Sequence, residues 1–395
     1  MHERRDAAAG AAAALRDEPA RAAGGARAKL ARLREELQQA FVERSELIDG
    51  ALAAVLASQH VLVIGPPGTA KSMLANELCC RFAGANYFQW LLTKFTTPEE
   101  LFGAVSLRAL EQDSYRRVTS RKLPEAHVAF LDEVFKASSS ILNAILTLMN
   151  ERVFHNGQEP VRVPLLSLFG ASNELPEDED LVALFDRFLL RFVVDYIAED
   201  FRFLKMLQAV PPAERTVLTL EELGRMQAEA GALPVPAHIY RALADVRREL
   251  KKRSVVASDR RYRQSLGLLK ALAYLRGRAV VSEADLLFLE HVLWRDPGER
   301  PDVRAVLCQL IYGYEDEVQE LLYQTREINE YAARAWETEE LRSHALIEAH
   351  TKIRKIVAKV EEIVEKARSL GRPLDKVDAA RREIQQIQTR MLESF

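Results

Sequence analysis

The segment that most restricts the fold of this chain is an apolar strand that runs into a glycine-containing loop and then a helix. Val61 to Ile64 are all aliphatic, and the next eight residues read Gly-Pro-Pro-Gly-Thr-Ala-Lys-Ser. Such a loop aims backbone N–H groups and a helix N-terminus at phosphate oxygens. We expect Lys71 to reach the β- and γ-phosphates of a nucleoside triphosphate and Ser72 to hold Mg²⁺. The predicted phosphate-binding residues are Gly65, Pro66, Pro67, Gly68, Thr69, Ala70, Lys71 and Ser72.

Ala70 is the departure within this loop. The general pattern G-x-x-x-x-G-K-[ST] has glycine before the lysine, and this chain has alanine there. Without further evidence, the segment could also be a strand-to-helix turn that binds no ligand. The loop alone therefore predicts a phosphate site and leaves that alternative open.

Composition narrows the class of protein. A chain of 395 residues with 48% hydrophobic content can form two or three domains. The net charge of −3 argues against attraction of the whole chain to nucleic acid or to an anionic membrane. The three cysteines lack metal-ligand spacing, and no apolar run approaches the roughly 18 residues of a membrane span. We expect a reduced, cytoplasmic protein without a membrane span.

The pattern along the chain predicts an α/β fold followed by helices. Residues 1–27 have almost no large apolar side chains, so we expect a disordered extension. The predicted α/β core covers 28–200 and begins with a helical pattern over 30–57. A helical lid over 201–297 and a helical tail over 298–395 follow. In the core, short apolar runs alternate with helical stretches, which is typical of a parallel sheet covered by helices. The expected strands are 61–64, 128–131, 165–170 and 190–194.

After residue 199 no strand pattern recurs. The predicted lid helices are 221–228, 236–250, 259–275 and 283–294. In the tail, apolar residues recur at steps of three and four over 353–367 and again over 377–391, with a break at Gly371 and Pro373. This spacing predicts an antiparallel helical hairpin or small bundle. It either packs on helices near Leu321 and Ile328 or docks a partner.

A second motif places two acids at the end of a strand. Val128 to Leu131 are followed by Asp132 and Glu133. A carboxylate at this point can hold Mg²⁺ beside Ser72, and the next one can orient and deprotonate an attacking water. The alternative is an ordinary acidic turn, which the preceding phosphate loop makes the weaker interpretation.

Polar residues at two later strand ends extend this pattern. Asn173 follows the run over 165–170, where its amide can hold the lytic water and sense the γ-phosphate. Arg187 and Arg191 flank an apolar run, and arginine suits neutralisation of charge on a transferring phosphoryl group. Either arginine could instead form a structural ion pair.

The order of these motifs resembles the MoxR group of AAA+ ATPases, with the branch of the regulatory ATPase RavA as the nearest resemblance. The resemblance covers about residues 40–296, and in this group alanine commonly stands where Ala70 does. It rests on the loop over 65–72, Thr-Thr-Pro-Glu-Glu-Leu-Phe-Gly over 96–103, Leu-Pro-Glu-Ala over 123–126, Phe-Leu-Asp-Glu over 130–133, Ile-Leu-Asn over 141–143 and Asn-Glu-Arg over 150–152.

The resemblance implies roles for particular residues. Lys71 and Ser72 match the Walker A pair, and Asp132 and Glu133 the Walker B pair. In the same way, Asn173 matches sensor 1, Arg187 the arginine finger that reaches an adjacent subunit, and Arg260 sensor 2. Arg191 remains an alternative finger and Arg261 an alternative sensor 2, and a solvated basic helix face over 247–263 remains open. Whether Arg260 acts in cis or in trans is also open.

The resemblance further implies an ATPase that works as a hexameric ring and remodels, matures or assembles a protein client. Inserts over 105–124 and 153–163 would engage that client, and the partner would bear a von Willebrand factor A (vWA) domain. An alternative of another class is a nucleotide-gated scaffold, in which ATP binding rather than turnover organises a partner complex. A nucleic-acid motor is disfavoured by the near-neutral charge.

Overall fold

The computed structural model describes residues 25–175, 179–197, 200–208, 215–311, 313–334, 336, 338–369 and 374–392. Most of the predicted N-terminal extension, residues 1–24, lies outside these ranges. Its last three residues do not fit the prediction, because a helix runs over 25–40. Arg27 donates hydrogen bonds to the carbonyl oxygens of Tyr274 (3.1 Å) and Arg278 (2.8 Å) and lies over the Tyr274 ring. These contacts anchor the start of the helix.

The chain forms two compact units. The first unit holds residues up to 234 together with 258–281 and 291–297, and the second holds 235–257, 282–290 and the chain from 298 onward. Helix α11 (Asp259–Leu275), expected in the lid, thus belongs with the sheet-containing unit. The limits at residues 200 and 297 stay predictions.

The first unit is built on a parallel sheet, as the sequence predicts, but the sheet has five strands instead of the four expected. The strand order is β3 (Tyr87–Leu91), β4 (Val128–Asp132), β7 (Ser167–Ser172), β1 (Val61–Ile64) and β8 (Leu190–Val193). All five run parallel, so their carboxyl ends meet at one edge. Strand β3 is absent from the predicted strands, because its apolar and polar residues do not form a continuous apolar run. The third predicted strand begins two residues before the observed β7.

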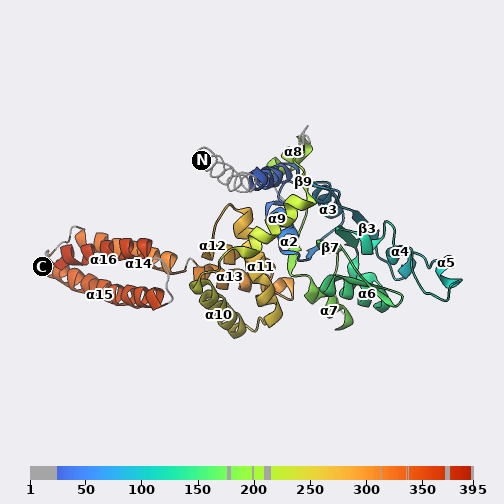
Figure 1. Ribbon diagram of the computed structural model, residues 1–395. Helices are drawn as coiled ribbons and strands as arrows, with labels where there is room; N and C mark the ends of the chain where they lie inside the picture. The colour runs from blue at the N-terminus through green and yellow to red at the C-terminus, as the bar shows by residue number, and fades with distance from the viewer. Residues whose placement is uncertain are drawn as a thin grey trace, which may run out of the picture. The chain divides into compact units, whose positions relative to one another are not determined.

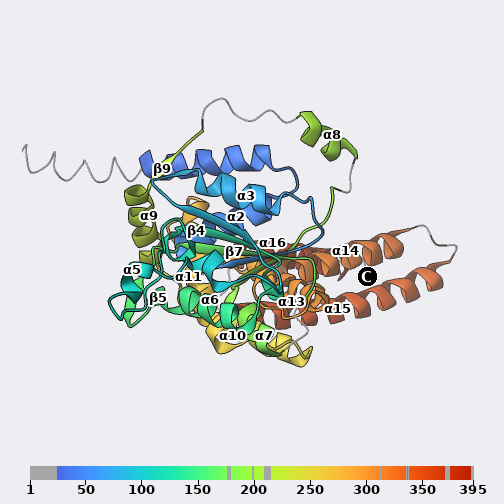
Figure 2. The same ribbon diagram turned by 90° about the vertical axis from the view of Figure 1, so that its right-hand side faces the viewer.

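Helices cover both faces of this sheet (Figures 1 and 2). Helices α2 (Ser45–Ala57) and α3 (Lys71–Cys79) lie on one face, and α6 (Ser139–Glu151) and α7 (Glu179–Arg187) lie on the other. The single helix predicted over 30–57 is interrupted at 41–44, where Glu43 has a positive φ of 60°. A residue in that conformation cannot continue a right-handed helix.

Shorter elements complete the first unit. Strand β2 (Phe82–Ala83) pairs in parallel with β9 (Leu218–Thr219), so the prediction of no strand after residue 199 is wrong for this one short pair. The remaining helices, besides α11, are α4 (Pro98–Phe102), α5 (Leu107–Leu110), α8 (Asp200–Gln208) and α9 (Leu220–Ala232), with 3₁₀ turns at Leu123–Glu125 and Val134–Lys136.

The two predicted inserts contact each other. Strands β5 (Val153–Asn156) and β6 (Glu159–Arg162) form the expected hairpin. The amide of Asn156 accepts a hydrogen bond from the backbone N–H of Arg117 (2.7 Å) and donates one to its carbonyl (3.2 Å). A Cβ at Gly157 would lie 1.9 Å from the carbonyl oxygen of Tyr115, so only glycine allows this approach. These contacts hold the two inserts against each other.

The second unit is helical. It contains α10 (Ala237–Lys252), α12 (Glu283–Leu286) and α13 (Arg300–Ile311). The helix predicted over 283–294 ends early, because a 3₁₀ helix, Leu287–His291, follows α12. Another 3₁₀ turn, Pro297–Glu299, precedes α13.

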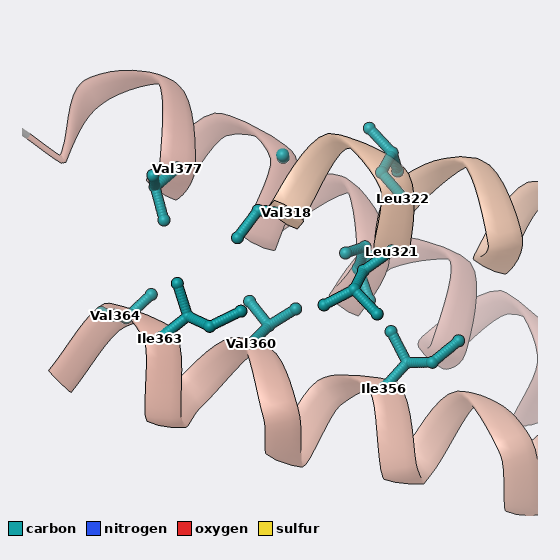
Figure 3. Packing of buried hydrophobic residues seen from close by; sticks show 10 residues of the cluster. Val318, Leu321, Leu322, Ile356, Val360, Ile363, Val364 and Val377 are labelled. Atoms are coloured by element: carbon teal, nitrogen blue, oxygen red, sulfur yellow. The ribbon is translucent and has the colours of Figure 1, made fainter. Parts of the chain in front are cut away.

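The tail is a three-helix bundle of α14 (Gly313–Ala333), α15 (Glu339–Ser369) and α16 (Asp375–Leu392). The predicted hairpin is α15 and α16, and its break at Gly371 and Pro373 lies outside the described residues. Figure 3 shows the shared core, to which α14 contributes Val318, Leu321 and Leu322, α15 contributes Ile356, Val360, Ile363 and Val364, and α16 contributes Val377, Ala380 and Ile384. No helix among the described residues has the length and apolar character needed to cross a membrane.

The loop between β1 and α3 carries backbone strain at Ala70. A Cβ at Gly65 would lie 2.1 Å from the carbonyl oxygen of Val194, so glycine is required there by close packing of the chain. Ala70, which precedes α3, has φ 63° and ψ 24°, the left-handed conformation. That conformation costs a non-glycine residue about 1–2 kcal/mol. The alanine that departs from the general loop pattern is thus also a strained residue.

Replacing Ala70 with glycine should stabilise the protein. Relief of the left-handed strain exceeds the added entropy of a glycine in the unfolded chain, which leaves a net gain of about 0.5–1 kcal/mol. The midpoint of thermal unfolding measures the change. As a control, Ala75→Gly lies inside α3 and should destabilise, since Ala75 is buried and helical. A lower midpoint for Ala70→Gly would contradict the assignment of strain.

His60 joins three elements of the first unit in the buried core. Its Nδ1 accepts a hydrogen bond from the backbone N–H of Leu168 in β7 (2.9 Å), and its Nε2 lies 2.7 Å from Nη1 of Arg152, which follows α6. Burial, helped by the nearby Arg152 charge, lowers the pKa of His60 to about 3. The folded protein therefore keeps this imidazole neutral under conditions in which the unfolded chain protonates it.

This depressed pKa makes the fold acid-sensitive. Between pH 6.5 and about pH 3 the unfolded chain binds a proton that the folded state refuses, so His60 should lower the free energy of unfolding by about 1.4 kcal/mol per pH unit. Urea unfolding of the wild type and of His60→Gln at pH 7 and pH 5 tests this. The variant should lose less stability on acidification, and parallel pH dependences would show that His60 is not responsible.

Candidate nucleotide site

The sheet brings the predicted site residues to one edge. Residue Ile64 at the end of β1 pairs with Ser172 of β7, and Leu131 of β4 pairs with Gly170 of β7. Strand β7 therefore lies between β1 and β4, so Asn173, which follows β7, stands between Lys71 and Glu133. The sequence predicts that these residues share an edge, and the strand order adds that the amide is in the middle.

Lys71 points into its own loop. Its Nζ donates hydrogen bonds to the carbonyl oxygens of Gly65 (2.6 Å) and Pro66 (3.0 Å) and approaches Oδ1 of Asn173 (3.4 Å). Burial lowers the pKa of Lys71, while Asp132 and Glu133 act to raise it. A phosphate is a stronger partner for an ammonium group than neutral carbonyls are, so the lysine is suited to an anionic ligand in the loop.

Asn173 connects the lysine to the second acid. Its Nδ2 donates to Oε1 of Glu133 (2.8 Å) while its Oδ1 faces Lys71, so one amide orientation satisfies both neighbours. Oε2 of Glu133 is buried and accepts no hydrogen bond, although Nζ of Lys136 lies 3.2 Å away. This oxygen has the capacity to accept a proton or a hydrogen bond from a water molecule.

The remaining loop and acid residues fit Mg²⁺ and phosphate. Thr69 is buried and its Oγ1 donates to the carbonyl of Pro66 (3.0 Å), which closes the loop. Ser72 begins α3, and Asp132 ends β4 at the same edge. Both side chains are half-buried and offer oxygen atoms of the kind that Mg²⁺ takes. These residues are the ones present to hold the ion with a nucleotide.

A largely apolar cavity of about 300 Å³ adjoins the loop. Gly68, Thr69 and Ala70 of the loop line it, so a ligand in the cavity could extend onto the loop with its phosphates. The side chain of Tyr196 fixes one wall by donating to the carbonyl of Pro67 (3.1 Å). This volume and lining suit a planar base. The other lining residues are Ala40, Phe41, Val42, Arg44, Met73, Ile197, Phe203 and Met206.

Sequence reasoning missed this cavity. Its walls come from the break after the first helix, from α3, from the segment after β8 and from α8, which are distant in sequence. The apolar residues Phe203, Leu204 and Leu207 of α8 are exposed in the structure. Apolar side chains on a surface helix can mark a binding site, so this helix could have been considered for a function.

The arginines at the end of α7 and the start of α11 form a second cluster. Arg187 is half-buried, and Nη2 of Arg260 donates to Oδ2 of Asp186 (2.5 Å). Burial lowers the pKa of Arg187, and the nearby charge of Arg260 lowers it further. The two arginines predicted to act on phosphate therefore lie close together.

The two alternative arginines are structural. Arg191 is buried and donates to the carbonyls of Trp294 and Phe185, and its guanidinium lies 3.8 Å from the centre of the Phe185 ring. Arg261 is also buried and donates to the carbonyls of Val292, Phe188 and Leu189. Neither side chain is free to reach a ligand outside the core. This geometry favours Arg187 and Arg260, the half-buried member of each pair, for an external role.

Family comparisons agree with this architecture. Residues 28–225 match the family described as the MoxR domain in the MoxR-vWA-beta-propeller ternary systems. Residues 238–307 match the AAA lid domain. The second match begins in α10 and ends in α13.

Curated relatives cover much of the chain. Two uncharacterised proteins of Methanocaldococcus jannaschii are 42% and 44% identical over 292 and 272 residues. These alignments cover 73% and 68% of this chain and 76% and 72% of the relatives. The chaperone MoxR1 of Mycobacterium tuberculosis is 27% identical over 274 residues, or 64% of this chain and 71% of MoxR1.

A solved structure supports the fold. A Cytophaga hutchinsonii protein assigned as an ATPase aligns with a TM-score of 0.61 at 15% identity, over 75% of this chain and 97% of that protein. The closer likeness to RavA stays a prediction. The parallel-sheet core, the lid match and the MoxR domain match over half of the chain identify the group, and this chain belongs to the MoxR family of AAA+ ATPases.

Proposed function

We propose that this chain hydrolyses ATP in a ring, most simply a hexamer, whose neighbouring copies complete each other's sites, and that the cycle remodels a protein client. The observation that carries the proposal is the chain of contacts from Lys71 through Asn173 to Glu133. Family membership supports the ATPase activity, and the name of the relative MoxR1 supports a chaperone-like use of it.

In this mechanism the phosphate loop and Lys71 hold the β- and γ-phosphates. Ser72 and Asp132 would hold Mg²⁺, which neutralises phosphate charge when bound. Glu133 accepts a proton from water as the water oxygen bonds to the γ-phosphorus, and the bond from that phosphorus to the bridging oxygen breaks to give ADP and phosphate. Asn173 orients Glu133 and the water. The cavity beside Tyr196 receives the adenine.

The arginines would act on a neighbour's nucleotide. Lys71 makes its hydrogen bonds with its own loop and Asn173, whereas Arg260 makes its hydrogen bonds with Asp186. Lys71 and Arg260 share no hydrogen-bond partner among the described residues, and they lie on different helices of the first unit. We therefore assign Arg187 as the finger, and Arg260 beside it, to the site of an adjacent copy.

The partner that we propose bears a vWA domain. The matching family is described from systems that combine a MoxR domain with a vWA protein and a β-propeller. Co-expression with a vWA-domain protein from the same organism, followed by size-exclusion chromatography with ATP, tests the pairing. Separate elution in the presence of the nucleotide would argue against it.

Mixing two inactive variants tests catalysis between subunits. Lys71→Ala removes the phosphate-binding lysine but leaves the arginines, and Arg187→Ala does the reverse. Each alone should lose about 10³-fold or more in ATPase rate, since an arginine finger contributes 10³–10⁵. Mixed, they should regain activity, because some interfaces then join an intact site to an intact arginine. Phosphate release measures the rate.

The control mixture pairs Arg187→Ala with the double variant Lys71→Ala, Arg187→Ala and should stay inactive. Full ATPase activity in Arg187→Ala, or in a strictly monomeric preparation, would overturn the assignment. Glu133→Gln distinguishes hydrolysis from the scaffold alternative. This variant should bind ATP and assemble without turnover. If it still supported client maturation, hydrolysis would not be the function.

A further inference from the structure

The Asp186 carboxylate has three arginines as partners, Arg191, Arg260 and Arg261. Its Oδ2 accepts the hydrogen bond from Arg260 at 2.5 Å, and its Oδ1 lies 3.5 Å from Arg261 and 3.7 Å from Arg191. Arg187 follows it directly in the chain, and Asp186 offsets part of the effect of Arg260 on the Arg187 pKa. Oδ1 of Asp186 therefore faces the two buried arginines, and Oδ2 binds the more exposed Arg260.

The buried arginines are held mainly by carbonyl oxygens, although Asp186 is also an anionic partner of both. Arg261 makes hydrogen bonds with the carbonyls of Phe188, Leu189 and Val292 at 3.0 Å or less, much shorter than its 3.5 Å contact with Oδ1. Arg191 is likewise held by carbonyls of Trp294 and Phe185. Because carbonyl oxygens fix these two arginines in place, their contacts with Oδ1 orient the Asp186 carboxylate.

Arg260 depends on Asp186. Its hydrogen bonds among the described residues go to the carboxylate and the carbonyl oxygen of Asp186. Its side chain is 35% exposed and that of Asp186 is 32% exposed, so solvent reaches the pair. Without the carboxylate, the nearby charge of Arg187 would repel Arg260 and a long side chain would sample many rotamers.

We propose that Asp186 is a positioning residue that holds Arg260 beside Arg187, so that both arginines are presented together to the nucleotide of a neighbouring copy. This inference rests on the proposed ATPase function and deepens it. The carboxylate screens the two cations from each other until a phosphate replaces it as a partner. The pair then acts as one donor unit, and Arg260 acts in trans.

A double-mutant cycle of Asp186→Asn and Arg260→Ala tests this role. Asp186→Asn should lower kcat by about tenfold or more, consistent with a positioned charge pair, and leave the KM for ATP within about twofold. In the Arg260→Ala background the same substitution should cause little further loss. A matched control, Asp302→Asn, removes the carboxylate of an exposed ion pair with Arg253 in the second unit and should leave kcat unchanged.

Subunit mixing separates positioning from a general defect. Asp186→Asn mixed with Lys71→Ala should regain activity, because the Asp186→Asn copy offers an intact phosphate site and its neighbour offers intact arginines. Mixed with Arg187→Ala, it should not, because the Asp186→Asn copy would then be the arginine donor. Asp186→Glu, which keeps the charge, should recover part of the kcat. The thermal unfolding midpoint verifies that each variant is folded.

Equal loss in both backgrounds of the cycle would overturn the positioning role, as would an unchanged kcat in Asp186→Asn. Recovery in both mixtures would show that Asp186 does not act through the donated arginines. Failure of the proposed function looks different: the wild type would not hydrolyse ATP, or its turnover would not depend on Lys71 and Glu133. The two inferences can therefore fail separately.

Discussion

The parallel pairing of β7 between β1 and β4 is the constraint on which the site depends. It places Asn173 where one amide reaches both Lys71 and Glu133, and a different strand order would put the lysine and the acid beyond reach of a shared side chain. The three residues lie on separate segments of the chain. Their contact is thus a property of backbone hydrogen bonding in the sheet, and the buried strands β1 and β7 make that pairing rigid.

Much of this arrangement follows from local sequence. The loop over 65–72 and the acids at the end of β4 could be predicted because each motif is a strand with its own polar ending. The helix of α11 was predicted at its observed bounds, since its apolar spacing and its Ser258 cap are local signals. Strand β3 was missed because an edge strand with alternating burial carries a weaker signal than a buried one.

Other features could not be predicted, because they depend on distant segments. Arg260 and Arg261 are neighbours in sequence, and only the carbonyls of Val292, Phe188 and Leu189 decide which of them is buried. The choice between Arg187 and Arg191 depends in the same way on Trp294. The cavity beside the loop combines Phe41, Tyr196 and Phe203, whose shared surface exists only after the chain has folded.

The contact between the two inserts has a mechanical consequence. Because Asn156 bonds to both backbone groups of Arg117, the β5–β6 hairpin and the segment carrying α5 are held together. Helix α6 leads almost directly into β5 of this hairpin, and its other end follows the short 3₁₀ turn Val134–Lys136, which Glu133 precedes. Under the proposed function, a client that pulls on either insert would therefore load α6, whose first turn follows Glu133, the proposed proton acceptor, by a few residues.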